Sequence, residues 1–241
     1  MSGEKVEEQL SVLVEKLKAA FGQRLVSAVL YGSAAMGDWD NRVSDLNVLC
    51  VLDRLSPAEL AASEPVFRWW REKNNPPPLL LTEEEVRTST DCFPMEFQDM
   101  QQHRRVLHGP DLIADLTIDR SFYRAQVEHE LRAKQIRLRQ KATEALSDRK
   151  RLTQLLTESL STFCVLGRHA LLLSGREPRW KKQEILSALE TVLRNPLRGA
   201  NAILSIRTSG KRNLDAADVS ILEQYLNEMD ALVRFVDALD K

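Results

Sequence analysis

The periodicity of apolar residues changes near residue 120, and this change limits how the chain can fold. Before it, short apolar runs alternate with amphipathic helical segments, whereas after it the spacing is helical to the end. Strands alternating with helices predict a sheet covered by helices, and a purely helical stretch predicts a bundle. We therefore expect an α+β fold, with a small mixed sheet in residues 1–119 and an all-α helical bundle in residues 120–241.

The first part contains four segments whose apolar runs predict strands: residues 25–31, 46–52, 79–81 and 93–100. Helices are expected between them at 6–20, 57–71 and 82–89, the last one opened by the Thr82 and Glu85 spacing of a capping box. In the second part, helices are expected at 122–146, 149–173, 181–193, 196–206 and 216–239.

Composition excludes several classes of protein. Hydrophobic residues make up 43% of the chain and charged residues 29%, which is ordinary for a globular protein and too apolar for a disordered one. No apolar run approaches the roughly 18 residues of a membrane span, and the acidic N-terminal segment lacks the features of a leader peptide. Three well-separated cysteines suggest neither a zinc site nor a disulfide framework. We expect a cytoplasmic protein with no membrane partner.

Charge is distributed unevenly. Residues 1–119 hold 12 Lys and Arg against 20 Asp and Glu, whereas residues 120–151 hold 10 against 4. An acidic domain joined to a basic helix can place phosphate-binding charge beside a metal site. A solvated helix face explains the same pattern, and a nucleic-acid partner remains open.

One stretch of the first part has the residue types of a phosphate and metal site. The first predicted strand ends in Gly32-Ser33, where a missing side chain lets a polyphosphate approach the backbone and a hydroxyl adds a donor. Asp45 and Asn47 follow, two residues apart, at the start of the next strand. Period-two geometry places both on one face, which is how a hard cation such as Mg²⁺ is presented to a triphosphate.

These residues resemble the motif of the nucleotidyltransferase superfamily, which includes DNA polymerase β, kanamycin nucleotidyltransferase and the streptomycin/spectinomycin adenylyltransferases. That motif is Gly-Gly or Gly-Ser, a spacer, an Asp-x-Asp or Asp-x-Glu strand, and a third acid on a later strand. Glu96 is the best match to the third acid, with Asp99 as the fallback. The helical second half also resembles the domain that follows the catalytic domain in the aminoglycoside-modifying members.

The resemblance implies a role for each matched residue. Asp45 and Glu96 would be catalytic, Gly32 and Ser33 would hold the nucleotide, and Asp45, Asn47 and Glu96 would ligate metal. Mg²⁺ would be bound together with a nucleoside triphosphate, for which ATP is our expectation. The reaction would move a nucleoside monophosphate from the triphosphate to a hydroxyl acceptor that the sequence does not identify. The amphipathic helices are also compatible with a homodimer.

Asn47 departs from the family motif, because an amide stands where the second carboxylate is expected. The amide keeps an oxygen but loses a charge, which should cost a few kcal/mol in metal binding where water is scarce. We therefore expect weakened catalysis. Asp38 or Asp40 lies in the same loop, but no positional argument assigns either to the metal. A degenerate protein that binds nucleotide or a protein partner is the alternative.

Three other interpretations compete with this hypothesis. The strand, Gly-Ser turn and Asp can be an ordinary βα connection, and Glu96 can be an edge charge that discourages aggregation. Arg124 and His129 match the Arg-x4-6-His spacing of HEPN-type ribonucleases, although residues five apart do not share a helix face cleanly.

Overall fold

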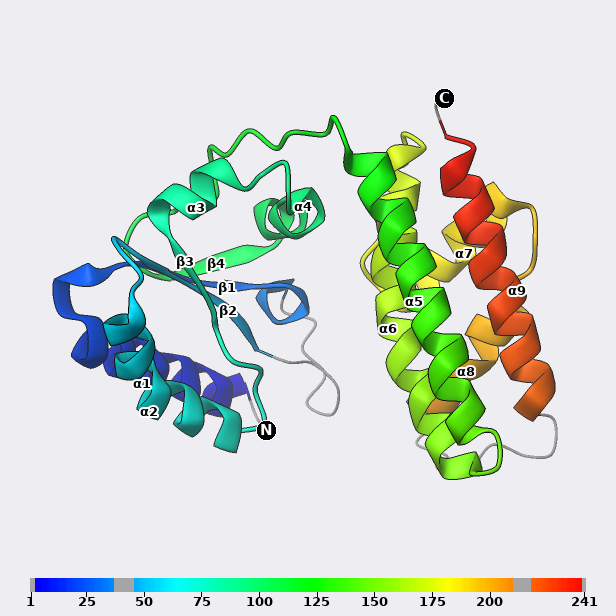
Figure 1. Cartoon of the computed structure of the whole chain (residues 1–241), viewed down its shortest axis with the longest axis horizontal. Helices are drawn as coiled ribbons and strands as arrows, with labels where there is room; N and C mark the ends of the chain where they lie inside the picture. The colour runs from blue at the N-terminus through cyan, green and yellow to red at the C-terminus, as the bar shows by residue number, and fades with distance from the viewer. Residues whose placement is uncertain (1–2, 37–45, 210–217, 240–241) are drawn as a thin grey trace. The chain divides into compact units, whose positions relative to one another are not determined.

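A computed structural model describes residues 3–36, 46–209 and 218–239. The chain divides into two compact units, Met1–Arg120 and Ser121–Lys241 (Figure 1). The first unit combines a sheet with helices, and the second is helical throughout its described residues. The predicted α+β class, with a small sheet followed by a helical bundle, is confirmed.

The sheet of the first unit has the strand order β3-β2-β1-β4. Its strands are β1 (Leu25–Tyr31), β2 (Asn47–Leu52), β3 (Leu79–Thr82) and β4 (Arg104–His108). β1 is antiparallel to both β2 and β4, whereas β2 and β3 are parallel, so the sheet is mixed as expected.

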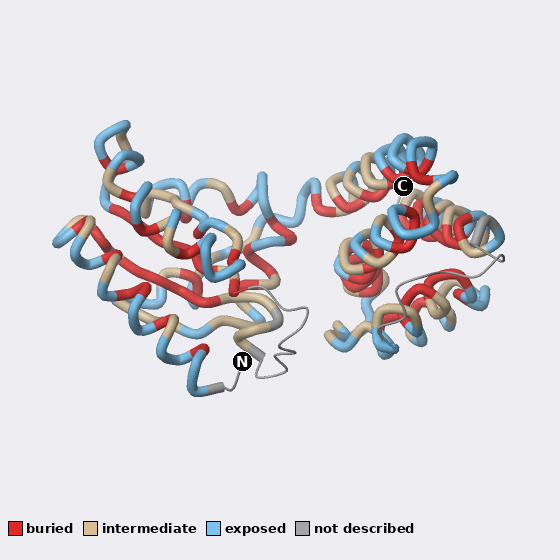
Figure 2. Tube along the Cα trace, turned by 90° about the horizontal axis from the view of Figure 1, so that it is seen from below, coloured by how far each residue is buried: buried red, intermediate tan, exposed pale blue. Residues whose placement is uncertain are grey.

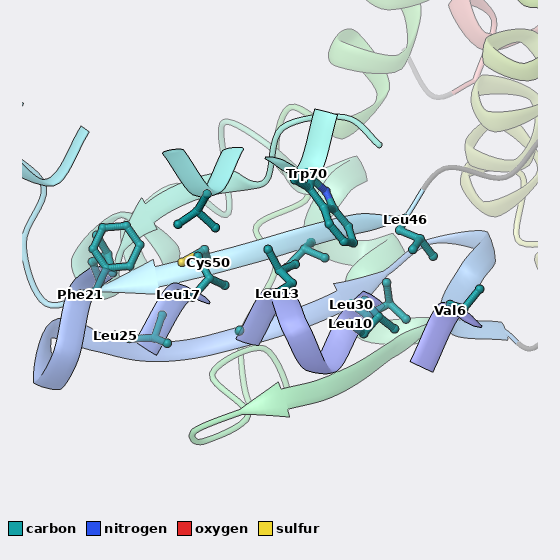
Figure 3. Close-up of a cluster of buried hydrophobic side chains, with 14 residues drawn as sticks. Val6, Leu10, Leu13, Leu17, Phe21, Leu25, Leu30, Leu46, Cys50 and Trp70 are labelled. Carbon is teal, nitrogen blue, oxygen red and sulfur yellow. The ribbon is translucent and has the colours of Figure 1, made fainter. Parts of the chain in front are cut away.

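Helices cover both faces of the sheet. α1 (Gly3–Phe21) and α2 (Pro57–Glu72) pack on one face, where Leu13, Leu17 and the buried Trp70 meet alternate residues of β1 and β2 (Figure 3). α3 (Glu83–Thr88) and α4 (Pro94–Gln102) supply Val86, Phe97 and Met100 to the core on the other face. The two central strands are therefore buried almost along their length (Figure 2), which explains why they read as continuous apolar runs.

The prediction of a strand at residues 93–100 is wrong, because Pro94–Gln102 forms helix α4. Proline stands in the first turn, where its missing N–H costs nothing. The buried positions of this helix are Pro94, Met95, Phe97, Gln98 and Met100. Their spacing is that of one broad helix face, which imitates alternation over a stretch this short. The fourth strand of the sheet is instead β4. It was not predicted because two adjacent arginines leave it without an apolar run.

The second unit is built around α6 (Arg149–Leu173), which packs against each of the other helices described there. These are α5 (Tyr123–Ala145), α7 (Lys182–Leu193), α8 (Arg198–Ser209) and α9 (Asp218–Asp237). A buried carboxylate joins two of them, because Glu228 of α9 accepts hydrogen bonds from the N–H groups of Gly199 and Ala200 at 2.7 and 2.8 Å. Over the described ranges, the structure contains no helix long and apolar enough to cross a membrane.

The core beneath α4 provides a test of this fold. The Phe97 side chain is 2% exposed, whereas that of Phe93, just before the helix, is 52% exposed. We expect Phe97→Ala to lower the free energy of unfolding of the first unit by about 3–5 kcal/mol through the cavity it leaves. Phe93→Ala, the matched control, should change it by less than about 0.5 kcal/mol. Urea denaturation measures both, and equal effects would contradict the helical assignment of Pro94–Gln102.

Candidate active site

The end of β1 and the start of β2 lie side by side at one edge of the first unit's sheet. Tyr31, the last residue of β1, is paired with Asn47, the first residue of β2. Gly32 follows with a φ of +80°, a conformation that residues with a side chain adopt only at a cost. A Cβ added to Gly32 would lie 3.4 Å from Nδ2 of Asn47. The structure thus places the Asn47 carboxamide directly against the predicted phosphate loop.

Backbone hydrogen bonds hold the Gly32 turn in place. The N–H of Gly32 donates to the carbonyl of His103 at 3.3 Å, and its own carbonyl accepts from the N–H of Ala35 at 3.0 Å. The second bond starts a single turn of 3₁₀ helix, Ser33–Met36. Because the Gly32 amide is already bonded, the amides in this turn that can meet a phosphate are those of Ser33 and Ala34.

A row of three side chains crosses the sheet at this edge. Asn47, Tyr31 and Arg104 are consecutive partners in β2, β1 and β4. Directly paired residues project from the same face of a sheet. Tyr31 packs in the cluster that contains Phe97 and Met100, so the row lies on the face that α4 covers.

Arg104 brings a cation into this row. Its guanidinium pairs with Asp111 at 2.8 Å and donates to the carbonyl of Gln101 at 2.6 Å. The hydrogen bond from Arg104 is the main reason that the pKa of the Asp111 carboxyl lies below its usual value. Sequence reasoning missed Arg104 because it missed β4. The apolar pair Val106 and Leu107, followed by Gly109-Pro110, was the available signal.

Glu96 reaches the site from a helix and not from a strand. It is an exposed residue in the first turn of α4. Burial raises the pKa of the Tyr31 hydroxyl above 10.0, and the negative charge of Glu96 raises it further, which places the carboxylate near the end of β1. Gln98, two residues after Glu96, lies on the buried side of α4 and is 5% exposed. Asp99 lies three residues on, so helical spacing turns it to the side of Glu96 and not away from it.

The structure does not describe the side chains of the other predicted ligands. Asp45 lies outside the described residues, as do Asp38 and Asp40, and the Ser33 side chain is not described either. Of the predicted site, the structure therefore brings together Gly32 and Asn47, while the charge of Glu96 raises the pKa of the adjacent Tyr31.

The described side chains can be tested against the requirements of a magnesium ion. They provide the Glu96 carboxylate and the Asn47 amide oxygen, and the described residues contain no group of three or more His, Cys, Asp or Glu that could hold a metal. Magnesium in phosphate-transfer sites commonly relies on one or two carboxylates together with the substrate's phosphates. These two oxygen ligands fit a magnesium ion that binds together with a nucleotide. They do not form a complete metal site by themselves.

Comparison with solved structures identifies the fold. The chain superposes on the crystal structure of spectinomycin adenyltransferase AAD(9) from Enterococcus faecialis with ATP and spectinomycin, with a TM-score of 0.63 and 15% sequence identity. The match covers 94% of this chain and 98% of that chain. No protein-family model and no curated protein matches the sequence. The fold expected from the motifs, an α+β domain followed by a helical domain, is thus shared with that adenyltransferase.

The structure gives no support to the HEPN-type ribonuclease interpretation of Arg124 and His129. Arg124 forms an ion pair with Glu128 at 2.8 Å, one helical turn along α5. His129 is exposed on the same helix, about 140° around the axis from Arg124.

The proximity of Glu96 to Tyr31 can be measured directly. Since the carboxylate raises the pKa of Tyr31, Glu96→Gln should lower that pKa, leaving it above 10.0 because burial remains. Glu84→Gln, on exposed α3, is the control and should leave it unchanged. Tyrosine ring carbon NMR shifts followed against pH report each hydroxyl separately. An unchanged Tyr31 pKa in Glu96→Gln would remove Glu96 from this edge of the sheet.

Proposed function

We propose that the protein binds a nucleoside triphosphate, with magnesium, at the end of β1 and transfers a nucleoside monophosphate to the hydroxyl of a small molecule. The observation that carries this proposal is the contact of Asn47 with the Gly32 turn, with the charge of Glu96 beside Tyr31. The same fold occurs in an adenyltransferase whose structure contains ATP and spectinomycin. ATP is therefore the expected donor.

Each residue has a defined part in the proposed reaction. The amides of Ser33 and Ala34, with the Ser33 hydroxyl, would bind the phosphates, because backbone N–H groups in such turns suit anions. Asp45, Asn47 and Glu96 would hold magnesium, which when bound offsets charge on the phosphates. Glu96 would also accept the proton of the acceptor hydroxyl. The hydroxyl oxygen bonds to the α-phosphorus, the bond from that phosphorus to the bridging oxygen breaks, and pyrophosphate leaves.

The two parts of the chain would have different roles. In this division of roles, residues 1–119 bind the nucleotide and the bundle selects the hydroxyl compound.

A second candidate function is nucleotide binding without turnover. The row across the sheet carries a neutral amide, a phenol and a cation, Asn47, Tyr31 and Arg104, where an active site of this class needs carboxylates. Such a face attracts phosphate more readily than it attracts a divalent cation. The protein would then sense a nucleotide, or present the nucleotide-bound state to a protein partner.

Two aspartates, one before and one after β2 in the sequence, provide a test of the nucleotide site and its control. ATP with Mg²⁺ should raise the melting temperature of the chain, because a ligand that binds only the native state stabilises it. Asp45→Ala should reduce this increase, whereas Asp53→Ala, exposed beyond the other end of β2, should not. Equal increases in wild type and Asp45→Ala would exclude Asp45 from the site. The other triphosphates, assayed in parallel, define the donor.

Asn47→Asp separates the two candidate functions. The replacement is nearly isosteric and adds a carboxylate against Gly32, so magnesium binding should tighten and pyrophosphate release should accelerate by about tenfold for each 1.4 kcal/mol gained in the transition state. Without metal, repulsion from nearby carboxylates should lower the melting temperature. Pyrophosphate release, with melting curves with and without Mg²⁺, measures both effects. A variant that binds ATP yet gains neither effect supports nucleotide binding without turnover.

A further inference from the structure

A groove in the second unit has the features of a small-molecule site. It runs between α5 and α6, has a volume of about 200 Å³ and reaches down to α9. Four apolar residues, all at most 4% exposed, form its floor: Leu138, Phe163, Leu166 and Met229. We call it the α5–α6 groove.

Cations from successive turns of α5 line one wall of the α5–α6 groove. They are Lys134, Arg137 and Lys141, spaced three and four residues apart, so they share one side of the helix. Lys134 is 4.0 Å from Glu130, a distant pair, and neither Arg137 nor Lys141 forms an ion pair with any described residue. Two of the three cations are therefore available to a ligand.

The α6 wall adds hydroxyl groups and one carboxylate. Ser159 and Thr162 line the groove, and the Thr162 hydroxyl has no hydrogen-bond partner among the described residues. The Ser159 oxygen lies 3.2 Å from that of the buried Tyr225. Glu158, the acidic residue of the lining, accepts a hydrogen bond from Gln154 at 2.8 Å. Three cations against one carboxylate give the groove a net charge of +2.

We propose that the α5–α6 groove binds a small phosphate monoester with an apolar or aromatic body. A phosphate monoester carries about −1.5 to −2 charges near pH 7, which matches the lining. Its oxygens accept from Arg137, Lys141 and Thr162, while the body covers the floor around Phe163. The volume is below the roughly 300–1,000 Å³ of sites for drug-sized ligands, so the ligand is small.

The lining also argues against an anionic polymer as the ligand. A nucleic acid bound through general charge would use the whole basic surface of α5. Arg139 is exposed on that surface and does not line the groove. Arg137 and Arg139 therefore form a matched pair, with the same charge on the same helix, of which only one lines the groove.

The experiment titrates the full-length chain with phenyl phosphate and with inorganic phosphate by calorimetry. Phenyl phosphate should bind at least about fivefold more tightly, because its ring can be buried on the floor. Arg137→Gln should weaken phenyl phosphate binding at least about tenfold by removing a charge-assisted hydrogen bond, and Thr162→Val should weaken it less. Arg139→Gln should leave it unchanged. Both arginines are exposed, so the variants should fold, which melting curves verify.

Three results would overturn the proposal. Equal loss in Arg137→Gln and Arg139→Gln would mean general attraction to a basic helix, as for a nucleic acid. Binding that survives Arg137→Gln would place the ligand elsewhere. Equal affinity for the two phosphates would mean that the floor is not used. The ATP-dependent rise in melting temperature should persist in Arg137→Gln, so this proposal and the proposed nucleotidyl transfer succeed or fail separately.

Discussion

The pairing of β1 with β2 is the interaction on which the first unit depends. Both strands are covered on two faces, so their hydrogen-bonded ladder holds the cores under α1 and α2 and under α4 in register. A slip of one residue would exchange the two faces and expose apolar side chains. The same register pairs Tyr31 with Asn47 and brings the Asn47 amide against Gly32. The candidate site is thus a direct consequence of how the core is buried.

The polar and charged groups of that site come from three different elements, β2, β4 and α4. Asn47 begins a strand, Arg104 belongs to an edge strand and is held by Asp111, and Glu96 approaches from the first turn of α4. A carboxylate on a helix can be displaced more easily than one held in a sheet, because only one end of a short helix positions it. The arrangement suits a nucleotide that brings its own magnesium better than a pre-formed metal centre. This is the physical basis for proposing a transferase weakened by Asn47.

The helical unit contrasts with the sheet unit in how it uses charge. Its buried carboxylate, Glu228, receives two backbone N–H groups at the start of α8, and burial raises the pKa of this carboxyl. That contact is structural, because it ties α8 to α9 through groups that solvent does not reach. Arg137 and Lys141, which form no ion pair with any described residue, lie instead on α5 over an apolar floor. Charge that can meet a ligand and charge that holds the bundle together are therefore carried by different helices.

The sequence by itself determined the α+β class, the first three strands and the α-helices other than α4. It also indicated the closeness of Gly32 and Asn47, because a buried strand, a glycine turn and a polar start to the next strand follow from local patterns. Only the tertiary structure decided the surroundings. Phe93, Met95 and Phe97 alternate as in a strand, whereas Phe97 and Met100 are spaced as in a helix, and the core beneath α4 selected the helix. Arg104 and Tyr31 entered the site through pairing with residues distant in the chain, and such long-range pairing leaves no mark in a local pattern.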